Sequence, residues 1–143
     1  MAEITDDYNA RIIREFRMND GAVGGDWTDI PLLLLHHTGA KTGARRVNPV
    51  AYLPVDGCYL VWAANGGQAN NPSWYHNLKA HPNTRIELGA VTRTVVAEEA
   101  VGKGRDRLFA IVSERYSQFV EAASRTERLI PMILLTPQSE RSR

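Results

Sequence analysis

Cations, hydroxyls and glycines crowd one nine-residue segment, residues 38–46, whose sequence is TGAKTGARR. Glycines let the backbone turn its N–H groups toward one point, lysine supplies a point charge, and arginine supplies a fork that suits phosphate or carboxylate. The segment does not match the phosphate-binding loop GxxxxGKS/T, and it is expected to lead into a strand. A solvated hairpin whose charges protect a sheet edge is the alternative. The residue types favour an anion-binding loop, and we predict that it holds the phosphate of a cofactor.

A second polar segment, residues 65–71 (NGGQANN), carries two glycines and several amides without periodicity. Pro72 follows it and suits the first turn of a helix that runs through Trp74 and Tyr75. Because a helix N-terminus offers free N–H groups and a partial positive charge, this segment could contact another polar part of the same ligand. A capped surface loop is the equal alternative. Trp74 and Tyr75 either fill the core or give a planar ligand a wall to stack on.

The four histidines give little support for a metal site. His36 and His37 are adjacent on an expected strand and so point to opposite faces. His76 and His81 do not have the spacing of an HExxH helix, and no carboxylate completes a ligand set. No GxSxG or comparable nucleophile motif occurs. We therefore predict no metal site and no covalent hydrolysis, and we expect His36 or His37 to be a hydrogen-bonded barrel residue.

The composition indicates one soluble domain over residues 1–143. Cys58 is the only cysteine, which excludes an intrachain disulfide and suits a reducing cytoplasm. The 17 basic and 16 acidic residues give a formal net charge of +1, which offers no general field for nucleic acid. No signal peptide and no apolar run of the ~18 residues that a membrane span needs are found. We therefore predict a cytoplasmic protein without a nucleic-acid partner.

Hydrophobic periodicity predicts an amphipathic helix of about three turns that includes Tyr8 and Phe16. Thr5 or Asp6 can cap its start, and Gly21 follows its end. Docking of this helix on the core is favoured, because it is acidic at its start and not rich in lysine or arginine. The alternative is a weak contact of residues 1–20 with the inner face of a membrane.

The remaining pattern predicts strands at residues 31–38, 47–53, 58–64, 84–88, 92–100 and 131–136, and helices at 72–78 and 102–123. The first three strands are expected to form an antiparallel meander with a tight turn at residues 54–57, and the next two a hairpin around Gly89. The long helix is expected to break near Ser117. Five or six strands and two or three helices favour a small antiparallel barrel with helices outside, and residues 138–143 are expected to be disordered.

Three strings, LLLLHHTGAKTGARRVNPVAYL, NGGQANNPSWYHNLKAHPNTRI and RLIPMILLTP, together resemble the deazaflavin-dependent nitroreductase family of actinobacteria over about residues 31–137. The pattern TGxKTGxxRxNP, followed by a Gly-Gly loop and NPxWYxNLKAxP, is long and ordered enough to be specific. The resemblance implies a mainly β domain with flanking helices (α+β), a split β-barrel of the FMN-binding-protein-like type. It also implies coenzyme F420, a deazaflavin with a phosphate and an oligoglutamate tail, whose reduced form donates a hydride.

The resemblance further implies roles for particular residues. Those expected to bind the phosphate and acidic tail are Lys41 and Arg46, helped by Thr42, Gly43 and Arg45. Those expected to line the deazaflavin edge are Val47, Asn48, Pro49, Ala63, Ala64, Gly66 and Gly67. Trp74 is expected near the ring and, with Phe119, in the substrate pocket. Tyr116 is expected to face the substrate and to donate a hydrogen bond or proton.

These roles predict a reductase that transfers a hydride to an electrophilic organic molecule: an activated C=C bond of an enone or lactone, a quinone, or a nitroaromatic. Relatives that activate bicyclic nitroimidazoles are similar but richer in pocket hydroxyls, with a serine in place of Ala64 and tyrosines in place of Phe119 and Ala122. Fewer donors orient a nitro group less well. The alternatives are an FMN-dependent oxidoreductase of the same fold and a noncatalytic cofactor- or ligand-binding protein. The substrate is a small hydrophobic molecule, and the oligomeric state stays open.

Overall fold

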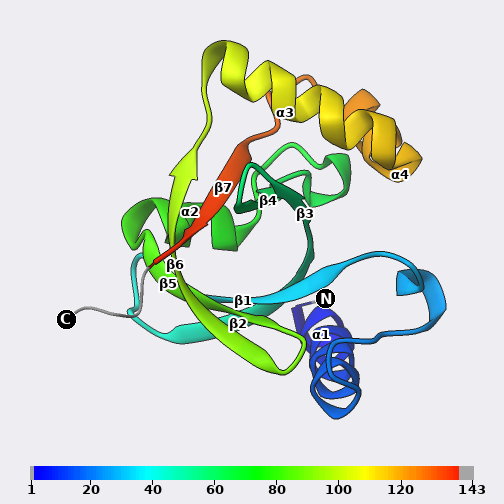
Figure 1. Cartoon of the computed structure of the whole chain (residues 1–143), viewed down its shortest axis with the longest axis vertical. Coiled ribbons are helices and arrows are strands. Elements are labelled where there is room, and N and C mark those ends of the chain that lie inside the picture. Colours follow the sequence, from blue (N-terminus) through cyan, green and yellow to red (C-terminus); the bar gives the residue numbers. More distant parts are fainter. Residues whose placement is uncertain (1, 139–143) are drawn as a thin grey trace.

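The computed structural model describes residues 2–138, with the side chains of residues 2–7 and of Asp26 left out. Within this range seven strands pair antiparallel in one curled sheet, and four α-helices lie outside it (Figure 1). The strand order is β2-β1-β5-β6-β7-β4-β3, so β2 and β3 are two edges that do not pair with each other. This open, split barrel confirms the predicted α+β fold.

The strands are β1 Leu32–Thr38, β2 Arg45–Ala51, β3 Leu53–Val55, β4 Cys58–Trp62, β5 Asn83–Leu88, β6 Val91–Glu99 and β7 Met132–Pro137. The α-helices are α1 Ala2–Met18, α2 Ser73–Ala80, α3 Gly102–Arg115 and α4 Ser117–Ser124. Two short 3-10 turns, η1 Gly25–Trp27 and η2 Asn65–Gly67, complete the elements.

Strand β1 is buried on both faces, which explains how a run of four leucines forms a strand. Successive side chains of a strand point to opposite faces. Leu33 and Leu35 accordingly enter the barrel interior, whereas Leu32 and Leu34 pack under helix α1. Strand β1 pairs with β2 along its whole length and with β5 on its other side. It therefore fixes the position of the loop that precedes β2.

The predicted meander of the first three strands is confirmed for the antiparallel pair β1 and β2 but wrong for the step to β4. The chain leaves the β1 ladder after Ala51, so the predicted strand 47–53 divides into β2 and β3 and raises the strand count to seven. Strand β4 pairs with β3 and with the distant β7, not with β2. The tight turn itself is confirmed: Asp56 and Gly57 have φ of 57° and 79°, the left-handed pair of a type I′ hairpin.

Helix α1 docks on the sheet, as the favoured prediction held. Its core face presents Ile12 and Phe16 to the leucines of β1. The helix begins at Ala2, so Thr5 and Asp6 lie inside it and neither is the predicted cap; Ala2 and Glu3 are good helix formers. At its other end Gly21, with φ of 98°, donates its N–H to the Phe16 carbonyl at 2.7 Å. No helix within residues 2–138 has the length and apolarity that crossing a bilayer requires.

The other local predictions are confirmed within one or two residues. Helix α2 follows Pro72, strands β5 and β6 form the hairpin, and the long helix breaks at Tyr116, which has extended φ and ψ of −131° and 114°. Gln138, the first residue of the predicted disordered tail, is ordered, because its N–H bonds the Thr94 carbonyl at 2.9 Å. The rest of that tail, 139–143, lies outside the described residues.

Three hydrophobic clusters hold these elements together. The barrel cluster lies between the sheet and α2 and includes Leu33, Leu35, Val61, Trp74, Leu78 and Ile86. The α3–α4 cluster includes Leu60, Leu108, Val112, Phe119, Ile130 and Met132. The α1 cluster includes Ile12, Phe16, Val23, Leu32 and Leu34. Strands β1 and β4 each contribute to two clusters, which ties both outer layers to the barrel.

Candidate functional site

The loop between β1 and β2 is closed on itself by its own backbone. The Gly39 N–H bonds the Ala44 carbonyl at 2.8 Å, and the Gly43 N–H bonds the Gly39 carbonyl at 2.9 Å. The Thr42 hydroxyl accepts the Ala44 N–H at 3.1 Å. A Cβ on Gly39 would lie 2.6 Å from that hydroxyl oxygen, so a side chain there would displace the Thr42 hydroxyl from its present position.

The cations of this loop are exposed and free to meet a ligand. Lys41, Arg45 and Arg46 are all exposed. None of them has an ion-pair partner within the part of the chain that the structure describes. Three unneutralised charges next to one turn favour an anion, so the predicted anion binding is consistent with this arrangement and stays a prediction.

A buried polar chain attaches this loop to the barrel. His37 is 3% exposed, and its Nε2 lies 2.7 Å from Asn48 Oδ1 while its Nδ1 lies 2.9 Å from Asn77 Nδ2. The imidazole is therefore neutral, donating from Nε2 and accepting at Nδ1. The pKa of His37 is lowered, and the largest cause is burial, which disfavours the charged ring. Asn77 Oδ1 in turn accepts the Ala40 N–H at 2.9 Å. Strand, helix and loop thus share one hydrogen-bond chain, which confirms His37 as a hydrogen-bonded barrel residue.

Two hollows flank the loop. One, of about 570 Å³, lies between the loop and the start of α2 and is lined by Lys41, Thr42, Arg46 and Ser73, among others. Helix α2 has no side-chain cap at this end, so its first N–H groups and positive dipole end face the same space. The structure thereby places the 38–46 loop beside the start of α2, whereas the 65–71 segment contributes Gly66 to a different cavity and does not line this hollow.

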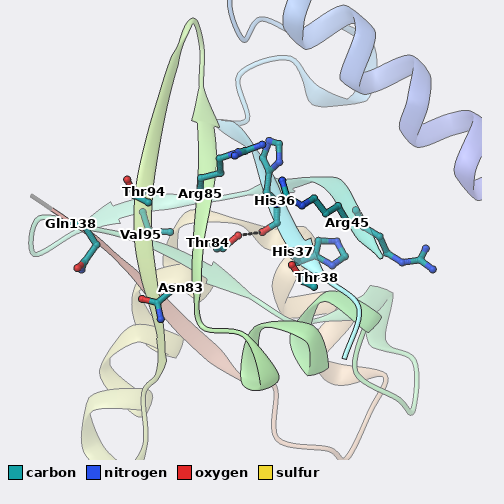
Figure 2. Close-up of a pocket in the computed structure, with 11 residues that line it drawn as sticks. His36, His37, Thr38, Arg45, Asn83, Thr84, Arg85, Thr94, Val95 and Gln138 are labelled. Carbon is teal, nitrogen blue, oxygen red and sulfur yellow. Dashed lines mark hydrogen bonds between the residues drawn. The ribbon is translucent and has the colours of Figure 1, made fainter. Parts of the chain in front are cut away.

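The second hollow, of about 300 Å³, lies over β1, β5 and β6 and is lined by Arg45, Arg46 and Arg85. Figure 2 shows its side chains on neighbouring strands, with the Thr84 hydroxyl donating to the His36 carbonyl. His36 itself bonds Glu87 at 2.8 Å, and that carboxylate also holds Arg17 of α1 in a two-pronged contact. The second hollow extends the cationic surface away from α2.

An apolar cavity of about 420 Å³ lies at the other end of β2. Its lining comes from α1, η1, β2, β4, η2 and α4, and consists of Tyr8, Trp27, Ile30, Ala51, Trp62, Ala64, Gly66, Tyr116, Gln118, Phe119 and Ala122. Trp62 packs on Tyr116 and Phe119, with ring centroids 5.8 and 6.1 Å apart. Aromatic faces of this kind suit a planar ligand.

Among the residues that line this cavity, Tyr116 has a buried hydroxyl group that lacks a hydrogen-bond partner in the described part of the chain. Its Oη is buried and has no hydrogen-bond partner within the described residues, which is rare for a buried hydroxyl. Burial, the largest cause, raises the pKa of Tyr116 above its ordinary value, so the group keeps its proton at neutral pH. The phenol lines the cavity while its oxygen is covered, so a ligand oxygen would meet this donor after a turn of the phenol or of a side chain that covers it.

The loop that carries Gly66 and Gly67 is shaped by one arginine. Arg128 donates to the carbonyls of Gln68, Ala63 and Ala64 at 3.1, 3.0 and 2.7 Å and to the side chain of Asn71. Gly66 lines the cavity, whereas Gly67 is buried against α4, where a Cβ would lie 2.5 Å from the Ala122 carbonyl oxygen. Ala63 is fully buried in the barrel cluster, and Ala64 lines the cavity. The loop therefore closes the cavity from below α4.

Strand β2 carries the three residues expected along the ring. Asn48 is fixed by His37, and Val47 packs on the α1 cluster. Pro49 sits on an edge strand, where its missing N–H does no harm. The same strand joins the cationic hollow, at Arg46, to the apolar cavity, at Ala51. Five residues of extended chain cover about 17 Å.

Trp74 packs in the barrel core, and its predicted contact with the ring and the substrate stays a prediction. This side chain is 8% exposed, belongs to the barrel cluster and does not line the apolar cavity. It lies four positions before Leu78, so both point from α2 into the barrel interior. The tryptophan that lines the cavity is Trp62. Alternation along β4 places Trp62 on the same face as Leu60, so this position could have been predicted.

Other residues of the site carried no sequence signal. Tyr8 and Trp27 reach the cavity only because α1 and η1 pack beside it, and Arg128 reaches the Gly66 loop from far along the chain. Within residues 2–138 no group of three or more potential metal ligands occurs.

Comparison with known proteins identifies a family. The family described as F420H(2)-dependent quinone reductase matches residues 9–137. An F420H(2)-dependent quinone reductase of Mycobacterium tuberculosis is 40% identical over 109 residues, 74% of this chain and 73% of that protein. The solved structure of an F420-H2 dependent reductase, FDR-A, matches with a TM-score of 0.66 at 33% identity, over 73% of this chain and 93% of that one. A chain solved as a domain-swapped dimer matches with a TM-score of 0.68 at 30% identity, over 92% and 98%.

These likenesses confirm the resemblance to F420-dependent reductases. The descriptions name F420 and a reductase, which weighs against the FMN-dependent and noncatalytic alternatives. The chain belongs to the F420H(2)-dependent quinone reductase family, oxidoreductases named for their use of reduced coenzyme F420.

Proposed function

We propose that this protein reduces a small hydrophobic acceptor, a quinone in the first place, with reduced F420 bound along strand β2. One observation carries the proposal: β2 connects a hollow rich in unpaired cations to an apolar cavity that contains a buried hydroxyl without a partner. An elongated cofactor with phosphate at one end and a planar ring at the other fits this arrangement. Enones, lactones and nitroaromatics are the further acceptor classes.

The cofactor's phosphate and tail lie, in this proposal, against the closed loop between β1 and β2. Lys41 and Arg46 bind the phosphate, with Thr42, Gly43 and the start of α2 adding hydroxyl and N–H donors. Arg45 extends the contact toward the second hollow, where carboxylates of the tail would meet Arg85. These charges face solvent in the described structure and have no internal partner to lose.

Within the cavity the protein's task is to bind, orient and exclude water. Reduced F420, when bound, supplies the hydride. The Tyr116 hydroxyl, short of a partner and protonated at neutral pH, donates a hydrogen bond to the acceptor oxygen and stabilises the negative charge that develops there. Trp62 and Phe119 flank the acceptor and keep the space apolar, while Ala64 and Gly66 leave room for the ring.

The test combines turnover with cofactor affinity. Purified protein and reduced F420 are mixed with quinones, enones, lactones and nitroaromatics, and loss of the reduced cofactor is followed by absorbance. Titration of oxidised F420 and of FMN should show binding of F420 alone. Lys41→Ala and Arg46→Ala should each weaken F420 binding about 10- to 100-fold, the worth of a charge-assisted hydrogen bond. Lys103→Ala, an exposed cation on α3, is the matched control. Tight FMN binding, or no oxidation by any acceptor, would refute the proposal.

We also propose a cytoplasmic protein whose residues 1–20 make at most a weak contact with a membrane. The apolar acceptor cavity, with Tyr8 of α1 at its wall, would suit an acceptor drawn from a lipid phase. Co-flotation with anionic vesicles checks this, with the full-length variant Arg11→Glu/Arg14→Glu, which reverses two exposed charges of α1, as the comparison. Equal flotation of both chains would argue against the contact.

A further inference from the structure

We infer that Tyr8 is a second hydrogen-bond donor in the acceptor cavity, and that together with Tyr116 it selects acceptors with two oxygen atoms on opposite sides of a ring, as in 1,4-quinones. The inference rests on the proposed function, since it concerns the same cavity. It adds a specificity-determining residue that no sequence pattern predicted.

Among the eleven lining residues, only Tyr8 and Tyr116 carry hydroxyls. They come from distant parts of the chain and from opposite sides of the fold: α1 packs on the leucines of β1, whereas Tyr116 joins α3 to α4 (Figure 1). The cavity extends between these two layers, with aromatic and small apolar side chains making up most of its wall. The two phenols therefore border the cavity from different layers of the fold, Tyr8 as an exposed residue and Tyr116 with its hydroxyl covered.

The Tyr8 hydroxyl is prepared to donate. Trp27 Nε1 donates to Tyr8 Oη at 2.7 Å, which occupies the phenol oxygen as an acceptor. The described hydrogen bonds give the Tyr8 O–H no protein acceptor, so its proton is available to a molecule in the cavity. A hydrogen bond accepted by a hydroxyl strengthens the one that it donates, and the indole contact thus improves Tyr8 as a donor.

The position of Tyr8 is held by packing and charge. Ile12 and Phe16, one and two turns further along α1, are buried against β1. At the end of the helix Arg17 contacts Glu87 of β5 with two hydrogen bonds, at 3.0 and 2.6 Å. Tyr8 is 38% exposed, so it lies at the mouth of the cavity while the Tyr116 hydroxyl is buried. In the inferred complex Tyr8 donates to one oxygen at the mouth, and the Tyr116 phenol turns so that its hydroxyl, which has no partner to give up among the described residues, donates to the other.

The experiment compares a two-oxygen ligand with a one-oxygen ligand of the same ring size. Protein loaded with oxidised F420 is titrated with 2-methyl-1,4-naphthoquinone and with 1-tetralone, and tryptophan fluorescence reports binding without turnover. Tyr8→Phe should weaken the quinone about tenfold, the typical worth of one hydrogen bond, and leave tetralone within twofold. Trp27→Phe, which removes the indole donor, should act in the same direction but less.

Tyr75→Phe is the matched control, because the Tyr75 hydroxyl donates to Glu99 of β6 and Tyr75 does not line the cavity. The inference is overturned if Tyr8→Phe leaves quinone affinity unchanged, or if it weakens both ligands equally. Turnover with reduced F420 is measured in parallel. If the wild-type protein binds the quinone in a Tyr8-dependent way but never oxidises the cofactor, the proposed function fails while the role of Tyr8 stands.

Discussion

Two neighbouring glycines of η2 test how the 65–71 loop is held against α4. Gly66 and Gly67 both have positive φ, 64° and 82°, so a side chain at either position meets the same backbone strain of about 1–2 kcal/mol. Only Gly67 is also crowded: its added Cβ would lie 2.5 Å from the Ala122 oxygen and 2.9 Å from Arg125 Cβ, whereas the space around Gly66 is open. Overpacking typically adds about 1–3 kcal/mol.

Gly67→Ala should therefore destabilise the fold by about 2–5 kcal/mol and Gly66→Ala by about 1–2 kcal/mol. For a chain of this size each kcal/mol lowers Tm by roughly 2–4 °C, so the two variants should melt at clearly different temperatures. Circular dichroism measures both melts, and the fluorescence titration with quinone reports the cavity. Because Gly67 packs on α4, its variant should also weaken quinone binding. Equal Tm losses in the two variants would show that the contact with α4 does not hold the loop.

The remaining predictions concern single polar groups. Tyr116→Phe should lower kcat/KM for quinones about 10- to 100-fold, and the wild-type rate should not fall with loss of the phenol proton until above about pH 10, because burial raises the pKa of Tyr116. Burial lowers the pKa of His37 in the folded state, so neutral His37 stabilises the fold fully above the unfolded pKa of about 6.5. This stabilisation is lost as the pH falls below that unfolded pKa. Tm should therefore drop more between pH 7 and pH 5 in the wild type than in His37→Gln. Asn77→Ala should cost about 1–3 kcal/mol by chemical denaturation, since it leaves Ala40 N–H and His37 without their partner. Arg128→Lys should keep the positive charge but lose the planar guanidinium that donates to three carbonyl groups. The loosened 65–71 loop should then be cleaved faster by a protease than in the wild type.

Sequence predicted those parts of the fold that depend on neighbours along the chain. The Asp56–Gly57 turn, the helix after Pro72 and the break beside Ser117 follow from residues that restrict their own backbone. The pairing of β4 with β7 could not be predicted, because it joins residues about 70 positions apart and depends on where the curled sheet closes.

The residues of the candidate site also divide into those that a local sequence pattern reveals and those that only distant packing brings together. The cationic loop was evident because its charges are contiguous in sequence, and the structure leaves them unpaired within the described range. The core position of Trp74 could not be predicted, because an aromatic at the start of a helix can face either a ligand or the core, and the packing of α2 decides between them. Tyr8 and Trp27 were missed because the indole–phenol contact exists only after α1 and η1 meet on the sheet.

The separation of the hydrophobic clusters has a consequence for how such proteins diversify. The cationic loop and α2 rest on the barrel cluster, whereas the acceptor cavity is enclosed by residues of α1, η1 and α4. Substitutions at Ile30, Gln118 or Ala122 can therefore reshape the acceptor space without disturbing the side chains that fill the barrel. After gene duplication, one copy could drift toward a new electrophile while its grip on the cofactor stays under unchanged selection.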